Sequence, residues 1–559
     1  HLDTFCREAL PPPELWPRML YSGVPELAYP PRLNCTAELL DARIAADAAD
    51  AGNAGNAGNA GNAGERTAIL FPGGRWSYRD LYETVNRIAH VLVGDLGLVP
   101  GNRVLLRGPN TPLLAACWLA VAKAGGVVVC TMPVLRVREL VYIADKAEIR
   151  LALTDTRVAP DCEQAMRVRG DGSPREGARV VHFQGEDPAD PAPGSLEALM
   201  RGKPADFSPR DTAADDVAAI LFTSGTTGQA KGTLHFHRDI LAVSDCFPRY
   251  VLKPTADDLF CGSPSLAFAY GVGGLLFFPL RFGASVLLLE QPLPTNLLHG
   301  IEDFRATICF TVPTAYRAMC GVIGGFDLSS LTKCVSAGET LPASTFETWE
   351  RTTGLRIIDG IGSTEMLHQF IGCTPEESRP GSTGRVVPGY QAKIVDENGA
   401  DLPPGEIGRL AVRGPTGCRY LADPERQQAY VQNGWNLTGD AYRMDADGYF
   451  WFQARTDDMI VSSGHNIAGP EVESVLLDHP KVKECGVVGV EDEERGQIVK
   501  AFVVLNDGAA PGPGTIRELQ DFVKAHIAPY KYPRKIEFVA SLPRTETGKL
   551  QRFRLRQGG

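Results

Sequence analysis

Residues 223–232 contain the side chains of this 559-residue chain whose types and spacing are best suited to chemistry. They read Thr-Ser-Gly-Thr-Thr-Gly-Gln-Ala-Lys-Gly and directly follow the apolar run 217–222. Glycines let backbone N–H groups converge on an anion, hydroxyl groups add donors, and a lysine adds positive charge. The pattern predicts a strand that runs into a phosphate-binding loop, and a Gly- and Thr-rich surface turn is the alternative. The residues expected to bind phosphate are Thr223, Ser224, Gly225, Thr226, Thr227, Gly228 and Lys231.

This loop does not fit the commonest phosphate-binding pattern. A Walker A sequence has four residues between its first glycine and a Gly-Lys pair, followed by Ser or Thr. Here Gly228 and Lys231 are separated by two residues and Gly232 follows, and no G-x-G-x-x-G comes after the strand. A kinase-like triplet at 237–239 lacks the asparagine that should follow it. Neither H-E-x-x-H nor G-x-S-x-G occurs, so hydrolase and metalloprotease activities lack their core residues.

Two later segments contain carboxylates that fit phosphate chemistry. In residues 359–365, Asp-Gly-Ile-Gly-Ser-Thr-Glu, the glycines allow close approach of a ligand, and the final carboxylate could hold Mg²⁺ beside a triphosphate. A strand-to-helix turn capped by Ser363 or Thr364 is the alternative. Asp440 follows a Thr-Gly pair and could accept hydrogen bonds from both hydroxyls of a ribose, although an isolated aspartate of this kind is more often part of a simple turn.

Together with the terminal segment 542–552, these motifs resemble those of the adenylate-forming superfamily. This superfamily includes acyl- and aryl-CoA ligases, peptide-synthetase adenylation domains and firefly-type luciferases. The resemblance extends from about Asn34 to Arg552, and the main motifs occur in order. One residue departs from the pattern, because the family usually has proline before the loop lysine and this chain has Ala230. We expect Ala230 to loosen the loop slightly without removing a donor.

The resemblance implies roles for residues near the nucleotide. Glu365 would be the Mg²⁺ ligand, and Thr364 would contact the α-phosphate. Asp440 would bind the ribose, with Arg455 supporting the same sugar and phosphate. Lys549 falls on the family's catalytic lysine, where a fixed cation would stabilise the charge that develops in the transition state. The remaining predicted ATP- and AMP-binding residues are Gly338, Glu339, Asp359 and Gly360.

The resemblance also implies a C-terminal domain that rotates between two half-reactions. Asp457 would be the hinge, since hinges are a few residues that absorb large changes in φ and ψ. Gly464 would line the tunnel for the pantetheine arm of CoA, where only a small residue leaves room. Phe268 would be the aromatic gate between the acyl site and this tunnel. The predicted domains are therefore 1–456, which binds ATP and the acyl group, and 457–559, which is mobile.

Three segments, 234–239, 267–273 and 359–368, resemble aryl-CoA ligases of the benzoate and 2-aminobenzoate type. Small residues would leave a flat slot for one aromatic ring with Tyr270 as a wall, and His368 could lie near the ring edge. We hypothesise that His368, together with Glu339, senses a ring substituent such as an amine. Plain core packing is the alternative for much of 267–280. The predicted acyl pocket consists of Phe268, Ala269, Tyr270, Gly271, Ala337, Gly360, Gly362 and His368.

These features predict an ATP- and Mg²⁺-dependent aryl-CoA ligase. An aromatic carboxylate would attack the α-phosphate of ATP to give aryl-AMP and pyrophosphate, and the thiol of coenzyme A would then displace AMP. One alternative is a stand-alone adenylating enzyme that loads an acyl-carrier protein. Another is a non-catalytic acyl- or nucleotide-binding protein of the same fold.

The elements that position these residues follow an alternating pattern. Apolar strands alternate with helical segments, which predicts an α/β fold with mostly parallel sheets. Near 380–455, Gly and Pro separate short strands, which predicts a small β-barrel-like subdomain. The pattern of the last hundred residues predicts a compact α+β domain. The Ala-Gly-Asn tract at 51–64 lacks large apolar residues and predicts a flexible loop. Residues 158–176 and 186–195 are expected to form surface loops.

Composition narrows the possible partners and compartments. A net charge of −11 argues against binding nucleic acid or an anionic membrane, so local basic residues must offset the global field if the ligands are anionic. The thirteen cysteines show no zinc or disulfide spacing, which favours reduced thiols. No signal peptide is evident, and the longest apolar runs are too short to span a bilayer. We expect a cytoplasmic monomer or homodimer.

Overall fold

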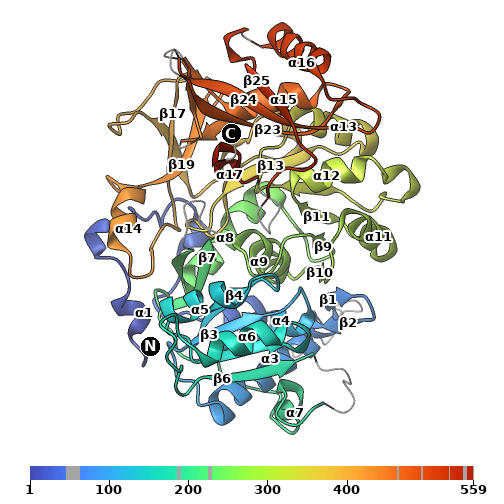
Figure 1. Cartoon of the computed structure of the whole chain (residues 1–559). Helices are drawn as coiled ribbons and strands as arrows, with labels where there is room; N and C mark the ends of the chain where they lie inside the picture. Colours follow the sequence, from blue (N-terminus) through green and yellow to red (C-terminus); the bar gives the residue numbers. More distant parts are fainter. Residues whose placement is uncertain are drawn as a thin grey trace.

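The structure is a computed structural model that describes residues 1–45, 63–184, 191–223, 230–456, 458–462, 465–492, 495–527, 529–544 and 550–557. Most of the Ala-Gly-Asn tract lies outside these residues. Figure 1 shows the first part of the chain at one end of the molecule and the C-terminal part at the other, with helices packed on both large sheets. The mixed α/β fold, with mostly parallel sheets and a separate C-terminal domain, confirms the predicted fold class.

A six-stranded sheet has the order β6-β5-β3-β4-β7-β8, and only its last pair is antiparallel. The strands β3 to β5 are apolar and almost wholly buried, as expected for parallel strands covered on both faces. The helix α4 (Pro112–Lys123) connects β3 to β4 and begins where the Thr111 side chain accepts from Leu114 N. The strands are β3 (Arg103–Arg107), β4 (Val127–Thr131), β5 (Leu151–Asp155), β6 (Arg179–Phe183), β7 (Val217–Thr223) and β8 (Lys231–Phe236).

The segment 158–176 is not a simple surface loop, so that prediction was wrong. Residues of α6 (Ala159–Arg167) form a helix that packs beside α5 and β5. Its buried side chains are small or flexible ones, Ala159, Cys162, Ala165 and Met166. Proline at its first turn is compatible with a helix, because the N–H that it lacks would have no intrahelical partner there.

A nine-stranded sheet has the order β15-β14-β13-β12-β11-β9-β10-β1-β2. The six strands from β13 to β1 in this order are parallel, and the edges are antiparallel. The strands are β1 (Thr67–Phe71), β2 (Gly74–Ser77), β9 (Leu259–Gly262), β10 (Ser285–Leu287), β11 (Ile308–Thr311), β12 (Lys333–Ser336), β13 (Ile357–Gly362), β14 (Gln369–Gly372) and β15 (Arg385–Val386).

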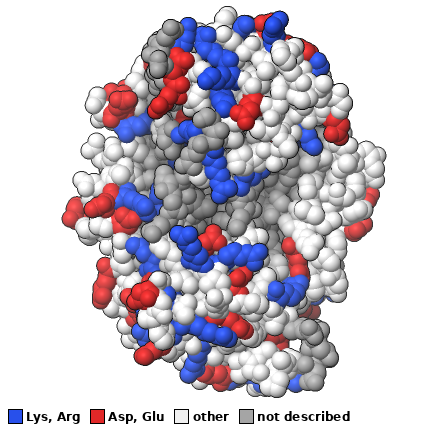
Figure 2. All heavy atoms as spheres, in the orientation of Figure 1, with Lys and Arg blue, Asp and Glu red and all other residues white. Residues whose placement is uncertain are grey.

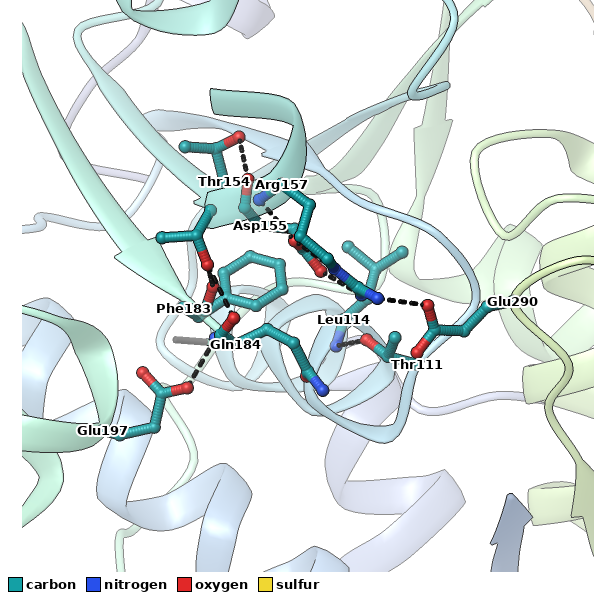
Figure 3. A network of polar contacts seen from close by, with 10 residues as sticks. Thr111, Leu114, Thr154, Asp155, Arg157, Phe183, Gln184, Glu197 and Glu290 are labelled. Atoms are coloured by element: carbon teal, nitrogen blue, oxygen red, sulfur yellow. Dashed lines mark hydrogen bonds and ion pairs between the residues drawn. The ribbon is translucent and has the colours of Figure 1, made fainter. Parts of the chain in front are cut away.

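Arg157 joins the two large sheets just beyond the carboxyl ends of their strands (Figure 3). Its Nε and Nη2 donate to the two oxygens of Asp155, at 2.9 and 2.7 Å, and this carboxylate is fully buried. Its Nη1 donates to Glu290 Oε2 at 2.6 Å, and Glu290 follows β10 of the other sheet. The bidentate, charge-assisted pair with Asp155 fixes the orientation of the guanidinium, which then reaches Glu290 of the other sheet with one hydrogen bond.

An antiparallel sheet of five strands follows, where a β-rich subdomain was predicted. It consists of β16 (Gln391–Val395), β17 (Ile407–Arg413), β18 (Val431–Gln432), β19 (Trp435–Met444) and β20 (Phe450–Arg455). The C-terminal part has its own five-stranded sheet and its own apolar core. Its elements are β21 (Ile460–Ser462), β22 (His465–Ile467), α15 (Gly469–Leu477), β23 (Val482–Asp492), β24 (Gly496–Leu505), α16 (Pro513–His526), β25 (Lys535–Phe538) and α17 (Arg552–Gln557).

Further helices cover the sheets and connect their strands. They are α1 (Phe5–Glu8), α3 (Tyr78–His90), α5 (Val137–Lys146), α7 (Leu196–Met200), α8 (His237–Phe247), α9 (Ala269–Val272), α10 (Phe278–Phe282), α11 (Pro294–Phe304), α12 (Pro313–Cys320), α13 (Ala343–Thr353) and α14 (Pro424–Tyr430). Over the part of the chain that the structure describes, none of the helices combines the length and apolar character needed to cross a membrane.

All thirteen cysteines are free thiols, and all but Cys130 and Cys320 are buried. Cys309 on β11 is the register partner of Cys261 on β9 and of Cys334 on β12. These thiols fill core positions as small apolar side chains.

Candidate functional site

The predicted site residues that the structure describes lie at the ends of strands in the two large sheets and in β19 and β20. Parallel sheets bind ligands in the crevice beyond the carboxyl ends of their strands. Figure 2 shows Lys and Arg side chains gathered around the middle of one face, as expected if local charge offsets the acidic whole. The predicted residues Ser224, Gly225, Thr226, Thr227, Gly228, Asp457, Gly464 and Lys549 lie outside the described residues.

The base of the predicted phosphate loop is a paired hairpin. Thr223, the last residue of β7, is the register partner of Lys231, the first residue of β8. The hydroxyl of Tyr142 donates to the carbonyl oxygen of Ala230 at 2.9 Å, so a neighbouring helix also holds this end of the loop. The sequence therefore correctly predicts a strand before the loop, and the structure adds an antiparallel strand after it.

Glu365 lies in the turn between β13 and β14, so the segment is a hairpin and not the strand-to-helix turn that was the alternative. Its Oε1 accepts a hydrogen bond of 2.7 Å from the hydroxyl of Tyr420, which is 1% exposed. Lys231 Nζ lies 5.6 Å from the centroid of the same tyrosine ring. We call Lys231, Glu365 and Tyr420 the Glu365 cluster.

The turn that contains Glu365 is tightly constrained. Thr364 O accepts from Leu367 N at 3.1 Å, and Leu367 has a left-handed backbone with φ of 68°. A branched side chain in this region costs about 1–3 kcal/mol, so the surrounding packing must enforce the turn. The hydroxyl of Thr416 donates to Met366 O at 2.8 Å and supplies part of that constraint.

Asp440 and Arg455, which were predicted to act on the same sugar, face each other across two strands. They are register partners on β19 and β20, and Arg455 Nη1 donates to Asp440 Oδ1 at 2.9 Å. Arg455 Nη1 also donates to Thr438 O at 3.1 Å. Asp440 is 8% exposed, so its carboxylate is largely shielded from bulk water.

Gly338 and Glu339 follow β12, whose last residue, Ser336, is the register partner of Asp359 on β13. Burial raises the pKa of Asp359 well above its usual range. Glu339 Oε1 lies 3.8 Å from Arg544 Nη1, and Arg544 also pairs with Glu484 at 2.8 Å. The ion pair between Glu339 and Arg544 connects the C-terminal part of the chain to the site.

Tyr270 and His368 lie together in a ring of aromatic side chains. The Tyr270 hydroxyl donates to the backbone oxygens of Thr311 and Val335, at 3.2 and 3.1 Å, which fixes the ring. The His368 ring centroid lies 5.7 Å from that of Tyr270, and two further rings, Phe278 and Phe247, lie 4.5 and 5.9 Å from it. We call Phe247, Tyr270, Phe278 and His368 the His368 cluster.

His368 is a buried polar group, 2% exposed. Among the residues that the structure describes, neither Nδ1 nor Nε2 has a hydrogen bond of good geometry, although the ring lies close to the backbone of Tyr270. Burial lowers the pKa of His368 to about 3, so its imidazole is neutral near pH 7. A neutral imidazole offers one donor and one acceptor, and a buried one without partners costs free energy. Glu339 lies 3.8 Å from Arg544, and its predicted joint role with His368 stays a prediction.

The glycines of the predicted acyl slot allow close packing within the protein, and their predicted role in leaving room for a ligand ring stays a prediction. A Cβ at Gly360 would lie 2.3 Å from Gln369 Nε2, and one at Gly362 would lie 2.6 Å from His368 O. A Cβ at Gly271 would lie 2.0 Å from Ser265 O. These positions let neighbouring backbone and side chains pack closely. Ala269 and Ala337 are buried, and Phe268 precedes α9.

Two residues near the site were missed in the sequence. Tyr420 lies fifty-five residues from Glu365, and only the short run Cys-Arg-Tyr-Leu between Gly417 and Ala422 marks it. Asn110 is 5% exposed, donates to Pro264 O and accepts from Leu266 N, both at 2.9 Å. It therefore holds the loop that leads into Phe268 and Tyr270. The sequence feature that could have indicated Asn110 is a polar residue shortly after the end of β3.

The Glu365 cluster is suited to one metal ion bound mainly by a ligand. In the described ranges, no group of three His, Cys, Asp or Glu side chains could form a metal site without other ligands. Mg²⁺ is commonly held by one or two carboxylates together with phosphate oxygens. Tyr420 occupies one oxygen of Glu365, and among the described residues Oε2 has no hydrogen-bond donor, so a single carboxylate ligand fits such an ion.

Comparisons with known proteins agree on one family. A family model described as AMP-binding enzyme matches residues 57–420, and one described as AMP-binding enzyme C-terminal domain matches residues 471–549. The benzoate–CoA ligase of Thauera aromatica is 36% identical over 502 residues, which cover 88% of this chain and 92% of that protein. The 4-hydroxybenzoate–CoA/benzoate–CoA ligase of Rhodopseudomonas palustris is 32% identical over 503 residues, covering 88% and 90%.

Solved structures give the same result. The crystal structure of the anthranilate CoA ligase AuaEII in complex with anthranoyl-AMP superposes with a TM-score of 0.86 at 33% identity. The match covers 96% of this chain and 99% of that one. A benzoate CoA ligase from Burkholderia xenovorans LB400 superposes with a TM-score of 0.81 at 32% identity, covering 94% and 100%.

Proposed function

We propose a specific reaction for this chain, which belongs to the AMP-binding enzyme family and, within the adenylate-forming superfamily, to its benzoate and anthranilate branch. It is an acid–thiol ligase of the aryl-CoA type. The proposed substrate is a benzoate or 2-aminobenzoate, which ATP activates as aryl-AMP before transfer to CoA. The observation that carries the proposal is the short turn that joins Glu365, which shares Tyr420 with Lys231, to His368, which lies among aromatic rings.

In the first half-reaction, the carboxylate of the aromatic acid attacks the α-phosphate and pyrophosphate leaves. The 223–232 loop and Lys231 bind the β- and γ-phosphates, Thr364 contacts the α-phosphate, and Asp440 with Arg455 holds the ribose. Glu365 would hold Mg²⁺, which when bound supplies charge neutralisation for the phosphates. Lys549 stabilises the charge on the carboxylate and α-phosphate. The contact between Arg544 and Glu339 supports this role, because it brings the terminal segment to the site.

In the second half-reaction, the C-terminal domain rotates about Asp457. Lys549 leaves, and the face that contains Gly464 guides the CoA thiol past Phe268 to the aryl-AMP. One domain used in two poses avoids a compromise between two geometries. The free thiols of the chain support a reducing compartment, and we propose that the enzyme acts in the cytoplasm.

The His368 cluster supports an aromatic acid over a fatty acid. Flat rings surround the site, and offset or edge-to-face contacts between rings are favourable beyond the area that they bury. The two imidazole nitrogens without partners would be satisfied by a substituent that can donate or accept a hydrogen bond. An amine beside the carboxylate, as in 2-aminobenzoate, has this property.

An ATP–pyrophosphate exchange assay across benzoate, its amino and hydroxy isomers, and fatty acids tests the proposal. We expect exchange with benzoate or 2-aminobenzoate to exceed that with a fatty acid by at least about tenfold, which corresponds to about 1.4 kcal/mol. Exchange that favours fatty acids would refute the aromatic assignment. A parallel assay with free CoA or a carrier protein as acceptor separates a CoA ligase from a carrier-loading enzyme.

A further inference from the structure

We propose that Tyr420 is a positioning residue that fixes the Glu365 carboxylate and separates it from Lys231, so that both charges remain available to the bound metal–nucleotide complex. This inference rests on the proposed function of Glu365. It assigns a role to a residue outside every motif by which the sequence was interpreted.

The contact itself is short and sheltered. The phenol donates to Glu365 Oε1 at 2.7 Å from a side chain that is 1% exposed. A donor that is fixed on one carboxylate oxygen restricts rotation of the group and directs the other oxygen.

The backbone of Tyr420 is held against the strand that begins with Lys231. Leu234 N donates to Arg419 O at 2.8 Å, and Leu421 N donates to Gly232 O at 2.9 Å. Thr233 and Tyr420 form an antiparallel bridge. The segment therefore runs alongside β8, and Tyr420 and Lys231 cannot shift independently.

Buried side chains on both sides reinforce this position. Arg419 pairs with Asp239 at 2.8 Å, and both are fully buried. On the other side, the Gln427 amide accepts from Tyr420 N at 2.9 Å and donates to Cys418 O at 3.0 Å. Breaking a buried pair by removing one partner is costly, so this framework resists displacement.

The ring of Tyr420 also lies between two opposite charges. Lys231 Nζ is within the distance at which a cation is attracted to an aromatic face, at 5.6 Å from the centroid. In the described part of the chain, Glu365 and Lys231 each contact Tyr420, the first at its hydroxyl and the second at its ring. A direct pair would neutralise both groups, whereas contacts through one phenol leave the ammonium for phosphate and the carboxylate for metal.

Tyr420→Phe is the decisive variant, because it keeps the ring and removes only the hydroxyl. Binding of Mn²⁺–ATP, followed by electron paramagnetic resonance without turnover, should weaken by about 10–100-fold, the usual effect of losing a partner of a metal ligand. The Mg²⁺ concentration for half-maximal pyrophosphate exchange should rise in parallel, with the KM for the aromatic acid unchanged. Tyr78→Phe removes another buried hydroxyl bond, 2.7 Å to Ala284 O, and should leave Mn²⁺–ATP binding unchanged.

Glu365→Gln separates failure of this inference from failure of the proposed function. A thermal melt first checks that Tyr420→Phe is folded. If Glu365→Gln then weakens metal–nucleotide binding and Tyr420→Phe does not, the proposed role of Tyr420 is overturned. Glu365 stays the proposed ligand in that case. If neither variant changes binding, the metal role of Glu365 itself is wrong. In the Glu365→Gln background, Tyr420→Phe should have no further effect, since residues that act through one contact are not additive.

Discussion

The Glu365 cluster and the His368 cluster lie at the two ends of one short turn and differ in how their polar atoms are satisfied. Glu365 has a fixed donor, and Lys231 has an aromatic face. His368 is enclosed by rings, and among the described residues neither of its nitrogens has a hydrogen bond of good geometry. The first arrangement is satisfied within the protein, and the second leaves polar atoms poorly satisfied. If the proposed function is correct, the nucleotide region would be preorganised, whereas the acyl region would gain stability from a matching substrate.

The largest effect is expected for Lys549, which would act on the charge that develops between the two clusters. Lys549→Ala should lower the rate of aryl-AMP formation by about 10²–10³-fold, the usual cost of losing one electrostatic contact to a transition state. Thioester formation from supplied aryl-AMP should remain near the unmodified rate. Equal losses in both half-reactions, measured separately by exchange and by single turnover, would contradict a role confined to adenylation.

A smaller effect on activity is expected when a neighbouring substitution shifts the His368 side chain and leaves the histidine itself in place. In Gly273→Ala, the new Cβ would lie 2.3 Å from His368 Cδ2, so the imidazole must move. We expect kcat/KM for the aromatic acid to fall by about tenfold, because small misplacements in a site are costly. The KM for ATP should not change. Gly94→Ala is the matched control in another helical segment, because no atom lies within 4 Å of its Cβ.

The His368 nitrogens themselves should affect selectivity rather than overall rate. In His368→Ala, the preference for 2-aminobenzoate over benzoate should fall by about fivefold, which corresponds to about 1 kcal/mol for one hydrogen bond. Competition between the two acids in a single reaction measures this ratio directly. An unchanged ratio would exclude His368 as the sensor of the substituent.

The smallest effect is on stability and depends on pH. Burial lowers the pKa of His368 to about 3, so below the unfolded pKa of about 6.5 the unfolded chain binds a proton that the folded chain does not. Stability therefore rises with pH and is lost as pH falls below about 6.5. Between pH 7.5 and 6.0, His368→Leu should lose less stability than the unmodified protein, by up to about 1 kcal/mol. Chemical denaturation at the two pH values measures it.

Local sequence patterns predicted the strand before the 223–232 loop and the alternation of strands with helices, and tertiary contacts account for what was missed. The strand β7 was predicted because it is a short apolar run that ends at turn residues. The helix α6 was missed because its buried face consists of small residues among charges. The role of Tyr420 depends on a contact across fifty-five residues, for which no local pattern exists.

For the predicted site, the structure adds contacts between residues and leaves their roles as predictions. Asp440 and Arg455 were predicted to share one ligand, and the structure pairs them directly. The small size of the glycines at 360 and 362 also serves packing against β14, and that strand cannot be assigned as their neighbour from sequence. A glycine in the sequence indicates that a side chain would not fit at that position, but it does not indicate which neighbouring group takes up the space.

The reactivity of the buried free thiols reports whether the molecule is unfolded. Burial raises the pKa of thiols such as Cys6 and Cys35 to about 12, so in the native state they hold little reactive thiolate. Unfolding would expose the buried thiols, all but Cys130 and Cys320, to water, where they can be alkylated or oxidised to mismatched disulfides. The rate at which a thiol reagent is consumed therefore measures the rate of global unfolding. Refolding from denaturant should succeed only when a reductant is present.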